Sequence, residues 1–74
     1  MKRISKLVDY PTPVKSRGGC KVSWAYYATE AEARECAIAA RRNARVLEAQ
    51  GYDFGYMAPG AVNEVDGLFE VCLP

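Results

Sequence analysis

The sequence predicts a small α+β domain with two layers, in which one long helix packs across a three-stranded, mainly antiparallel sheet. Three observations predict this strand–helix–hairpin (βαββ) order: an alternating segment at residues 20–28, a capped helical segment that ends near residue 50, and a hairpin signal at residues 66–67. The chain of 74 residues suffices for one hydrophobic core. A core of this size buries only roughly 60% of the unfolded surface, so we expect a thin margin of stability.

The helix is the most sharply defined element of the sequence. Thr29-Glu30-Ala31-Glu32 is a capping box, and Gly51 supplies a left-handed stop after a run of good helix formers. At about 100° per residue the segment separates into two faces. One is a stripe of mostly small apolar residues that we expect to lie on the sheet: Ala33, Cys36, Ala37, Ala40, Ala44 and Leu47. The other face carries Arg34, Ile38, Arg41, Arg42 and Arg45.

Two segments have the patterns of strands. The alternation of residues 20–28 predicts a half-buried strand that buries Trp24 and Tyr26 and exposes Tyr27. Asp66-Gly67 predicts a two-residue hairpin turn that pairs Val65 with Leu68. In that register Val62, Phe69, Val71 and Leu73 share the core face. The C-terminal strand is the most apolar, so we expect it in the middle of the sheet, antiparallel to both neighbours.

Charge divides the chain into unequal parts. Residues 1–21 carry six basic side chains and one acid, whereas residues 51–74 carry four acids and no base. Residues 1–18 are therefore expected to form a basic, partly flexible N-terminal arm, with a short strand within residues 4–8, and residues 19–74 a single α+β domain. Five cations are candidate contacts for nucleic acid or an acidic partner: Lys2, Arg3, Lys6, Lys15 and Arg17. The alternative is that the oppositely charged ends simply attract one another.

Several function classes find little support in the sequence. There is no histidine, so Ser and Cys side chains lack the usual catalytic base, and we expect no enzyme activity. The three cysteines are expected to be small buried hydrophobic residues, with no metal site and no cofactor. Asp53-Phe54-Gly55 spells the metal-binding tripeptide of protein kinases, but the other kinase motifs are missing. With no apolar run of ~20 residues and no signal-peptide pattern, we expect a cytoplasmic protein.

Binding is the function that the composition favours. Trp24, Tyr26 and Tyr27 beside basic residues would suit stacking of nucleic-acid bases, although no sequence signature of an RNA-binding module is present. Arginine and tyrosine also dominate the hot spots of protein interfaces. The predicted partner-binding residues combine the arginine face of the helix with the aromatic segment after it: Arg34, Ile38, Arg41, Arg42, Arg45, Tyr52, Phe54 and Tyr56.

Two stretches carry a resemblance to a known class of protein. The segment "YYATEAEARECAIAARRNARVLEAQGYDFGYMAPGAV" and the C-terminal "DGLFEVCLP" resemble small uncharacterised proteins of tailed bacteriophages. The resemblance covers roughly residues 24–74 and assigns no site residue. It implies a regulator that binds a host macromolecular machine in the bacterial cytoplasm, with RNA polymerase as the first candidate and transcription as the process modulated. The alternatives are a small RNA- or DNA-binding protein that uses the arm and the helix arginines, and an inhibitor of a bacterial defence enzyme.

Overall fold

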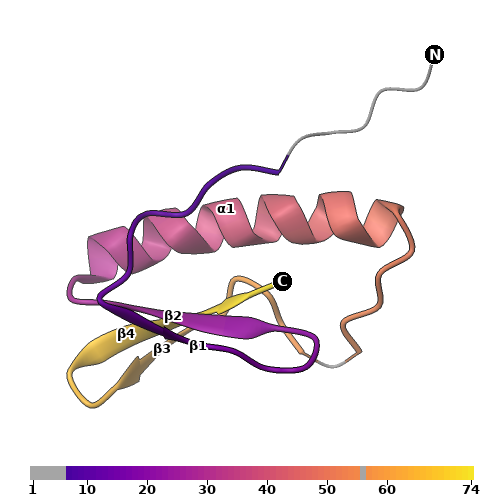
Figure 1. Cartoon of the computed structure of the whole chain (residues 1–74). Coiled ribbons are helices and arrows are strands. Elements are labelled where there is room, and N and C mark those ends of the chain that lie inside the picture. The colour runs from indigo at the N-terminus through magenta and orange to yellow at the C-terminus, as the bar shows by residue number, and fades with distance from the viewer. Residues whose placement is uncertain (1–6, 56) are drawn as a thin grey trace.

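One helix lies across a four-stranded antiparallel sheet in the computed structural model, which describes residues 7–55 and 57–74 (Figure 1). The elements follow one another as β1 (Lys15–Arg17), β2 (Ser23–Tyr27), α1 (Glu30–Ala49), β3 (Val62–Val65) and β4 (Leu68–Leu73). The order across the sheet is β1-β2-β4-β3. The α+β class and the central, antiparallel position of the C-terminal strand are confirmed.

The prediction of three strands is wrong, because residues 15–17 form an additional edge strand. β1 pairs with β2, Lys15 opposite Tyr26 and Arg17 opposite Trp24. The prediction missed this strand because three polar residues after a proline have no apolar alternation. Residues 7 and 8, at the end of the short strand suggested for residues 4–8, lie outside any strand, and the rest of that segment lies outside the described residues.

The predicted limits of the helix are confirmed. The Thr29 hydroxyl accepts a hydrogen bond of 3.3 Å from the Glu32 backbone N–H, as a capping box requires. At the other end Gln50 is the C-cap and Gly51 has a φ of 100°. A residue with a Cβ would be strained in that conformation, so glycine ends the helix at little cost.

The hairpin has the predicted register. Val65 pairs with Leu68 and Glu64 with Phe69 around the Asp66-Gly67 turn. Both turn residues have positive φ, 51° and 78°, which is the geometry of a type I′ turn. β4 then pairs with β2 along five residues, from Ser23 opposite Leu73 to Tyr27 opposite Phe69.

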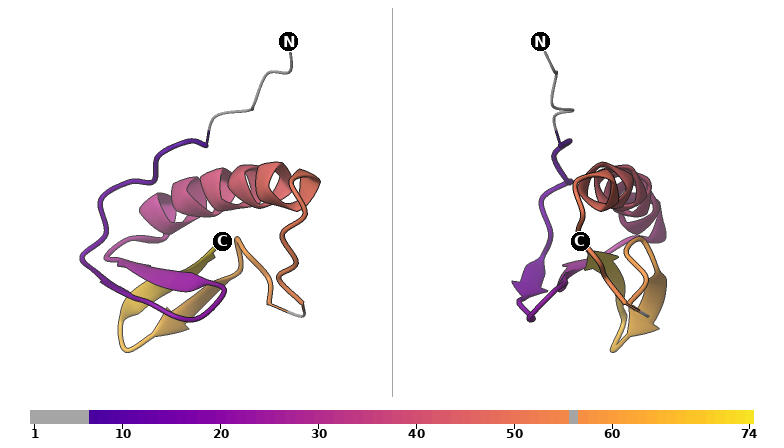
Figure 2. Two further views of the ribbon diagram at one scale, coloured as in Figure 1. Left: turned by 45° about the vertical axis from the view of Figure 1, so that its right-hand side comes forward. Right: turned by 90° about the vertical axis from the view of Figure 1, so that its right-hand side faces the viewer.

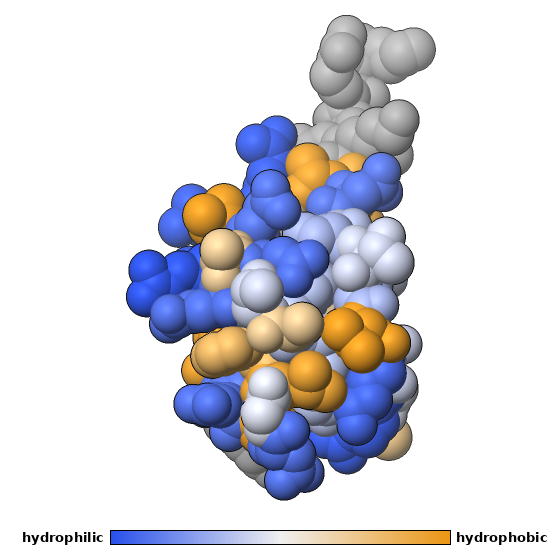
Figure 3. Space-filling model, turned by 90° about the vertical axis from the view of Figure 1, so that its left-hand side faces the viewer, coloured by the Kyte–Doolittle hydropathy of each residue, from blue (hydrophilic) through white to orange (hydrophobic). Residues whose placement is uncertain are grey.

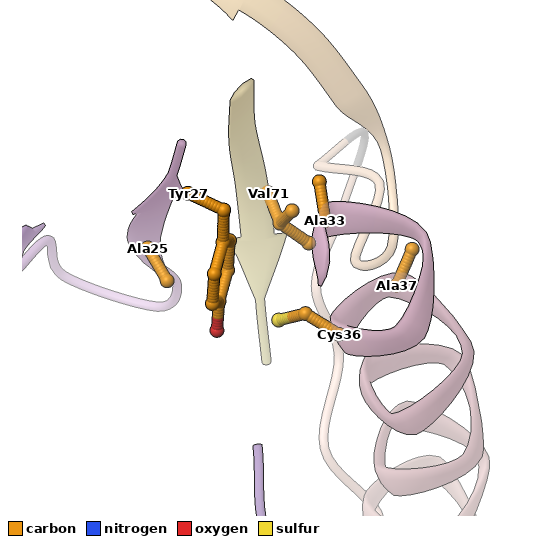
Figure 4. Close-up of a cluster of buried hydrophobic side chains, with 6 residues drawn as sticks. All are labelled: Ala25, Tyr27, Ala33, Cys36, Ala37 and Val71. Atoms are coloured by element: carbon orange, nitrogen blue, oxygen red, sulfur yellow. The ribbon is translucent and has the colours of Figure 1, made fainter. Parts of the chain in front are cut away.

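The assignment of the two faces of β2 requires a correction. Ala25 and Tyr27 point toward the helix and form a buried cluster with Ala33, Cys36, Ala37 and Val71 (Figure 4). Because side chains alternate along a strand, Trp24 and Tyr26 lie on the opposite face of the sheet. Both sets of β2 side chains contain aromatic residues, so alternation separates the faces without telling which one meets the helix. Tyr27, expected to be exposed, is therefore the largest of the fully buried side chains, while Tyr26 is buried as expected and Trp24 is partly buried.

The small-residue stripe of α1 lies against the sheet as predicted. Ala33, Ala37, Ala40 and Ala44 are buried together with Cys36, and Leu47 is partly buried. A second cluster formed by Val22, Ala44, Phe54 and Cys72 fills the space near the end of the helix. Residues 50–55 run from the end of α1 down toward the sheet, and residues 57–60 lead into β3 at this end of the molecule (Figure 1).

The segment before β1 forms a third wall of the core. α1 lies mainly over the central strand β4, whereas residues 7–14 descend on the side of β1 (Figure 2). Asn43, 2% exposed, fastens this segment to the helix. Its Oδ1 accepts from the Val8 N–H (2.8 Å), and its Nδ2 donates to the Val8 carbonyl (2.9 Å) and the Tyr10 hydroxyl (2.8 Å). At the residue after Tyr10, the Pro11 carbonyl accepts a hydrogen bond of 2.8 Å from the Tyr27 hydroxyl.

Removing the helix cap tests the capping box. Thr29→Ala should lower the free energy of unfolding by about 1 kcal/mol, because one N-terminal backbone N–H loses its acceptor. Thr12→Ala, at an exposed threonine in the N-terminal segment, is the matched control and should lower it by under about 0.5 kcal/mol. Chemical denaturation gives both values. Equal denaturation midpoints for the two variants would show that the Thr29 cap does not stabilise the helix.

Asn43 should be the most sensitive polar position of the protein. Asn43→Ala removes three hydrogen bonds and should cost roughly 2 kcal/mol or more of unfolding free energy. It should also speed hydrogen exchange at the Val8 amide. Asn63→Ala, at an exposed asparagine of β3, serves as the control. If the two variants unfold at the same denaturant concentration, the N-terminal segment contributes nothing to stability through Asn43.

Candidate protein-binding surface

The outer face of α1 carries the predicted arginine residues together with one large apolar residue. All five residues of this arginine face are exposed: Arg34, Ile38, Arg41, Arg42 and Arg45. Ile38 is 66% exposed, the largest value among the exposed large hydrophobic residues. The helical period brings residues three and four positions apart into contact range, so Ile38 lies between Arg34 and Glu35 on one side and Arg41 and Arg42 on the other. The sequence-based grouping of these five residues is confirmed.

The arginines of this face differ in their partners. Arg34 donates to the Glu30 carboxylate at 3.1 Å, one turn earlier on the helix. Arg41 donates to the Gly60 carbonyl at 3.3 Å and so connects the helix to the loop before β3. Within residues 7–55 and 57–74, neither Arg42 nor Arg45 takes part in an ion pair. Their charges are available to an acidic group from outside.

Two shallow hollows border this face. One, of about 480 Å³, is lined by Ile38, Val46 and the arginines at 41, 42 and 45. The other, of about 510 Å³, lies between α1 and the edge of the sheet. Its walls come from both elements: Glu30, Arg34, Ala37, Ile38 and Arg41 on the helix, and Gly60, Ala61 and Val62 on the chain that enters β3. Ile38 and Arg41 line both hollows and therefore join them.

The aromatic segment after the helix does not form the surface that the sequence suggested. Tyr52 is 58% exposed, but Phe54 is only 6% exposed and belongs to the second core cluster, so its assignment as a partner-binding residue is wrong. Tyr56 lies outside the described residues. Asp53 accepts a hydrogen bond from the Gly55 N–H at 2.8 Å, and Gly55 has a φ of 64°. The kinase-like tripeptide is thus a local Asx turn that aims Phe54 into the core.

The candidate basic contacts near the N-terminus lie on a different surface. Lys15 and Arg17 belong to the β1 edge and to the sheet face turned away from the helix. Lys15 Nζ lies 5.0 Å from the centre of the Tyr26 ring, and Arg17 Cζ lies 4.3 Å from that of Trp24. Tyr26 donates to Glu70 at 2.6 Å, and Arg17 approaches the same carboxylate at 3.9 Å. Lys2, Arg3 and Lys6 lie outside the described residues.

The end of the molecule at which α1 begins differs from the arginine face in how its hydrophobic and hydrophilic side chains are arranged. There, hydrophobic side chains gather in the middle of the view and hydrophilic side chains border them (Figure 3). Away from α1, Val14 before β1 and Val65 at the end of β3 are 64% and 36% exposed. Neither is surrounded by arginines along a regular element, as Ile38 is.

The cysteines require one correction. Cys36 and Cys72 are buried as expected, but Cys20 is exposed in the turn between β1 and β2. Burial raises the pKa of the Cys36 thiol, and the nearby Tyr27 hydroxyl partly offsets this. Burial and the charge of Glu70 both raise the pKa of the Cys72 thiol. Burial likewise raises the pKa of the Tyr27 hydroxyl. Among the described residues, no group of three or more side chains is arranged to hold a metal ion.

Comparison with known proteins found no matching family model, no similar curated protein and no similar solved structure. In the part of the chain that the structure describes, no helix is long and apolar enough to cross a membrane.

Thiol labelling should separate the three cysteines into two classes. At neutral pH we expect Cys20 to react rapidly in the native protein. Cys36 and Cys72 should react only after unfolding, because burial both blocks access and disfavours the thiolate. The Cys20→Ser variant should then show no rapid phase. A rapid phase that persists in Cys20→Ser would contradict the burial of the other two thiols.

Proposed function

We propose that this chain is a non-enzymatic binding protein that docks on an acidic surface of a partner protein through the arginine face of α1. The observation that carries the proposal is Ile38, an aliphatic side chain left 66% exposed between arginines on a regular helix. An apolar centre with a charged border is the usual anatomy of a protein interface, in which arginine is enriched.

The energetics of the arginine face support association. Burying Ile38 against a partner would contribute part of the roughly 1.5–3 kcal/mol that a fully buried aliphatic side chain contributes. Arg42 and Arg45 would supply charge-assisted hydrogen bonds to carboxylates and would attract an acidic partner at a distance. Arg41 is held by its bond to Gly60, so its guanidinium loses less conformational freedom on binding than a free side chain would.

Nucleic-acid binding is the second candidate, and its support is the pair of cations over aromatic rings on the far face of the sheet. A sequence-independent binder needs a continuous track of cations along the phosphate backbone. Here Lys15 and Arg17 are on the β1 edge, whereas the helix arginines flank β3 at the opposite edge. Tyr26, 8% exposed, also has little free ring surface for a base. These placements favour a protein partner.

The resemblance to small phage proteins suggests which partner to test first. On that ground we propose bacterial RNA polymerase as the first candidate, with modulation of transcription as the consequence of binding. A bacterial defence enzyme is the alternative of the same class. Both would be recognised through an acidic patch that complements the arginine face.

A pair of charge-matched variants tests the proposal. Arg42→Ala with Arg45→Ala removes two cations from the arginine face and should weaken partner binding by roughly 2 kcal/mol or more. The free energy of unfolding should change by under about 0.5 kcal/mol, since both side chains are exposed. Lys15→Ala with Lys21→Ala removes the same charge near the β1 edge and should leave protein binding nearly intact.

Pull-down from nuclease-treated bacterial lysate, followed by binding to purified RNA polymerase at several salt concentrations, measures both pairs. If the arginine variant captures the same partner at the wild-type level, the arginine face of α1 is not the binding site. Capture that disappears with nuclease, falls steeply with salt and depends on the lysine pair would instead establish nucleic-acid binding.

A further inference from the structure

We propose that the partner enters the groove between α1 and β3 as an extended acidic segment and adds a fifth strand to the sheet along β3. This inference rests on the proposed function, because the arginine face forms one wall of the groove. It adds the mode of binding and the chemistry of the segment that is bound.

The first support is the unpaired edge of β3. A two-residue turn makes Val65 and Leu68 a hydrogen-bonded pair, and such pairs alternate along an antiparallel ladder. Asn63 with Glu70 is then the next hydrogen-bonded pair, and the bond from the Cys72 N–H to the Ala61 carbonyl (3.1 Å) continues the series. The N–H and C=O groups of Val62 and Glu64 therefore point away from β4. Within residues 7–55 and 57–74 no strand pairs with this edge, so a strand from a partner can do so.

The two edges of the sheet differ in how well they tolerate an added strand. β1 has three residues, two of them Lys15 and Arg17, and it follows Pro13. Short length, cations and a nearby proline are the features that discourage strand addition. β3, residues 62–65, contains neither lysine nor proline. The β3 edge, whose one charged residue is Glu64, therefore opposes an added strand less than the β1 edge does.

The groove beside β3 can receive the side chains of such a strand. Its volume is about 510 Å³, enough for a few side chains, and its lining between the two charged ends includes Ala37, Ile38 and Val62. In an added strand, alternate side chains would point to the helix side of the sheet and enter this space. Backbone bonds would give affinity, and the groove would select the alternate side chains.

Charge selects the chemistry of the segment. The groove is lined by Arg34 and Arg41 and by a single acid, Glu30, whose carboxylate is already bonded to Arg34. Arg42 and Arg45 extend the positive charge past Ile38. A segment in which acids alternate with small aliphatic residues would point its carboxylates to the helix side, toward these arginines, and its aliphatic side chains to the opposite face of the sheet.

A second copy of this chain fits the edge poorly. Two β3 strands paired antiparallel in one sheet are related by a two-fold axis perpendicular to that sheet, so both helices would lie on the same side. Each arginine face flanks β3, and the two faces would therefore approach one another across the junction. Like charges brought together in this way disfavour the pairing.

The variant Glu64→Pro tests strand addition separately from the side chains that line the groove. Glu64→Pro removes an outward N–H while leaving the bonds to β4 intact, since proline is tolerated on edge strands where the N–H faces solvent. Glu64→Ala is the matched control, which removes the carboxylate and keeps the N–H. The probes are two fluorescent short peptides, one alternating valine with glutamate and the other alternating valine with lysine.

We expect the glutamate peptide to bind the wild-type chain about tenfold or more tightly than the lysine peptide. Glu64→Pro should weaken binding about fivefold or more relative to Glu64→Ala, the loss expected for one hydrogen bond. In the complex, hydrogen exchange at the Val62 and Glu64 amides should slow. Equal affinity of the proline and alanine variants, unchanged exchange, or a concentration-dependent dimer that the proline abolishes would each overturn strand addition. If Arg42→Ala with Arg45→Ala still weakens partner capture in that case, the arginine face binds the partner without an added strand.

Discussion

The close approach of α1 to the sheet is the constraint on which the other features depend. Ala33, Ala37, Ala40 and Ala44 present almost no side chain to the strands, so the helix backbone comes near enough for Tyr27 and Val71 to fill the space between the layers. A stripe of alanines has a low entropic cost, but it buries little area, and roughly 25 cal/mol is gained per Å² of apolar surface. The sheet must therefore obtain additional cover from other parts of the chain.

That cover comes from two irregular segments, each fixed by a specific polar contact. On the β1 side, Asn43 satisfies both backbone groups of Val8 and so brings Tyr10 and Pro11 over the core. A buried amide of this kind is stabilising only if its partners are all present. On the other side, the Asx turn at Asp53 directs Phe54 inward beside Val22 and Cys72. Both segments serve the core, whereas Arg42 and Arg45 of the arginine face form no ion pair within the residues that the structure describes.

Local patterns predicted the helix, its two ends, the hairpin register and the central position of the last strand, because each depends on residues near in sequence. The features that were missed depend on long-range contacts. Asn43 is polar, and no local rule tells that a segment more than 30 residues earlier will bond to it. The exchanged faces of β2 and the burial of Phe54 have a similar cause, since aromatic residues suit both a core and a binding surface. The five arginine-face residues were correctly grouped because helical spacing alone puts them together, whereas the groove beside them depends on where β3 lies.

Arg41 connects that groove to the fold. Gly60 has a φ of 93°, and a Cβ at this position would come within 2.5 Å of the Arg41 side chain, so the backbone of the loop packs directly on the arginine. The Gly60 carbonyl accepts from Arg41 (3.3 Å), while its N–H donates to the Cys72 carbonyl (2.8 Å). A single glycine therefore holds together the helix face, the start of β3 and the end of β4. Because α1, β3 and β4 are joined at Gly60, the helix wall of the groove and the β3 edge keep their relative positions before a partner binds. A partner that binds there need not first order the site, and this preorganisation favours the β3 edge over the unpaired side chains further along α1.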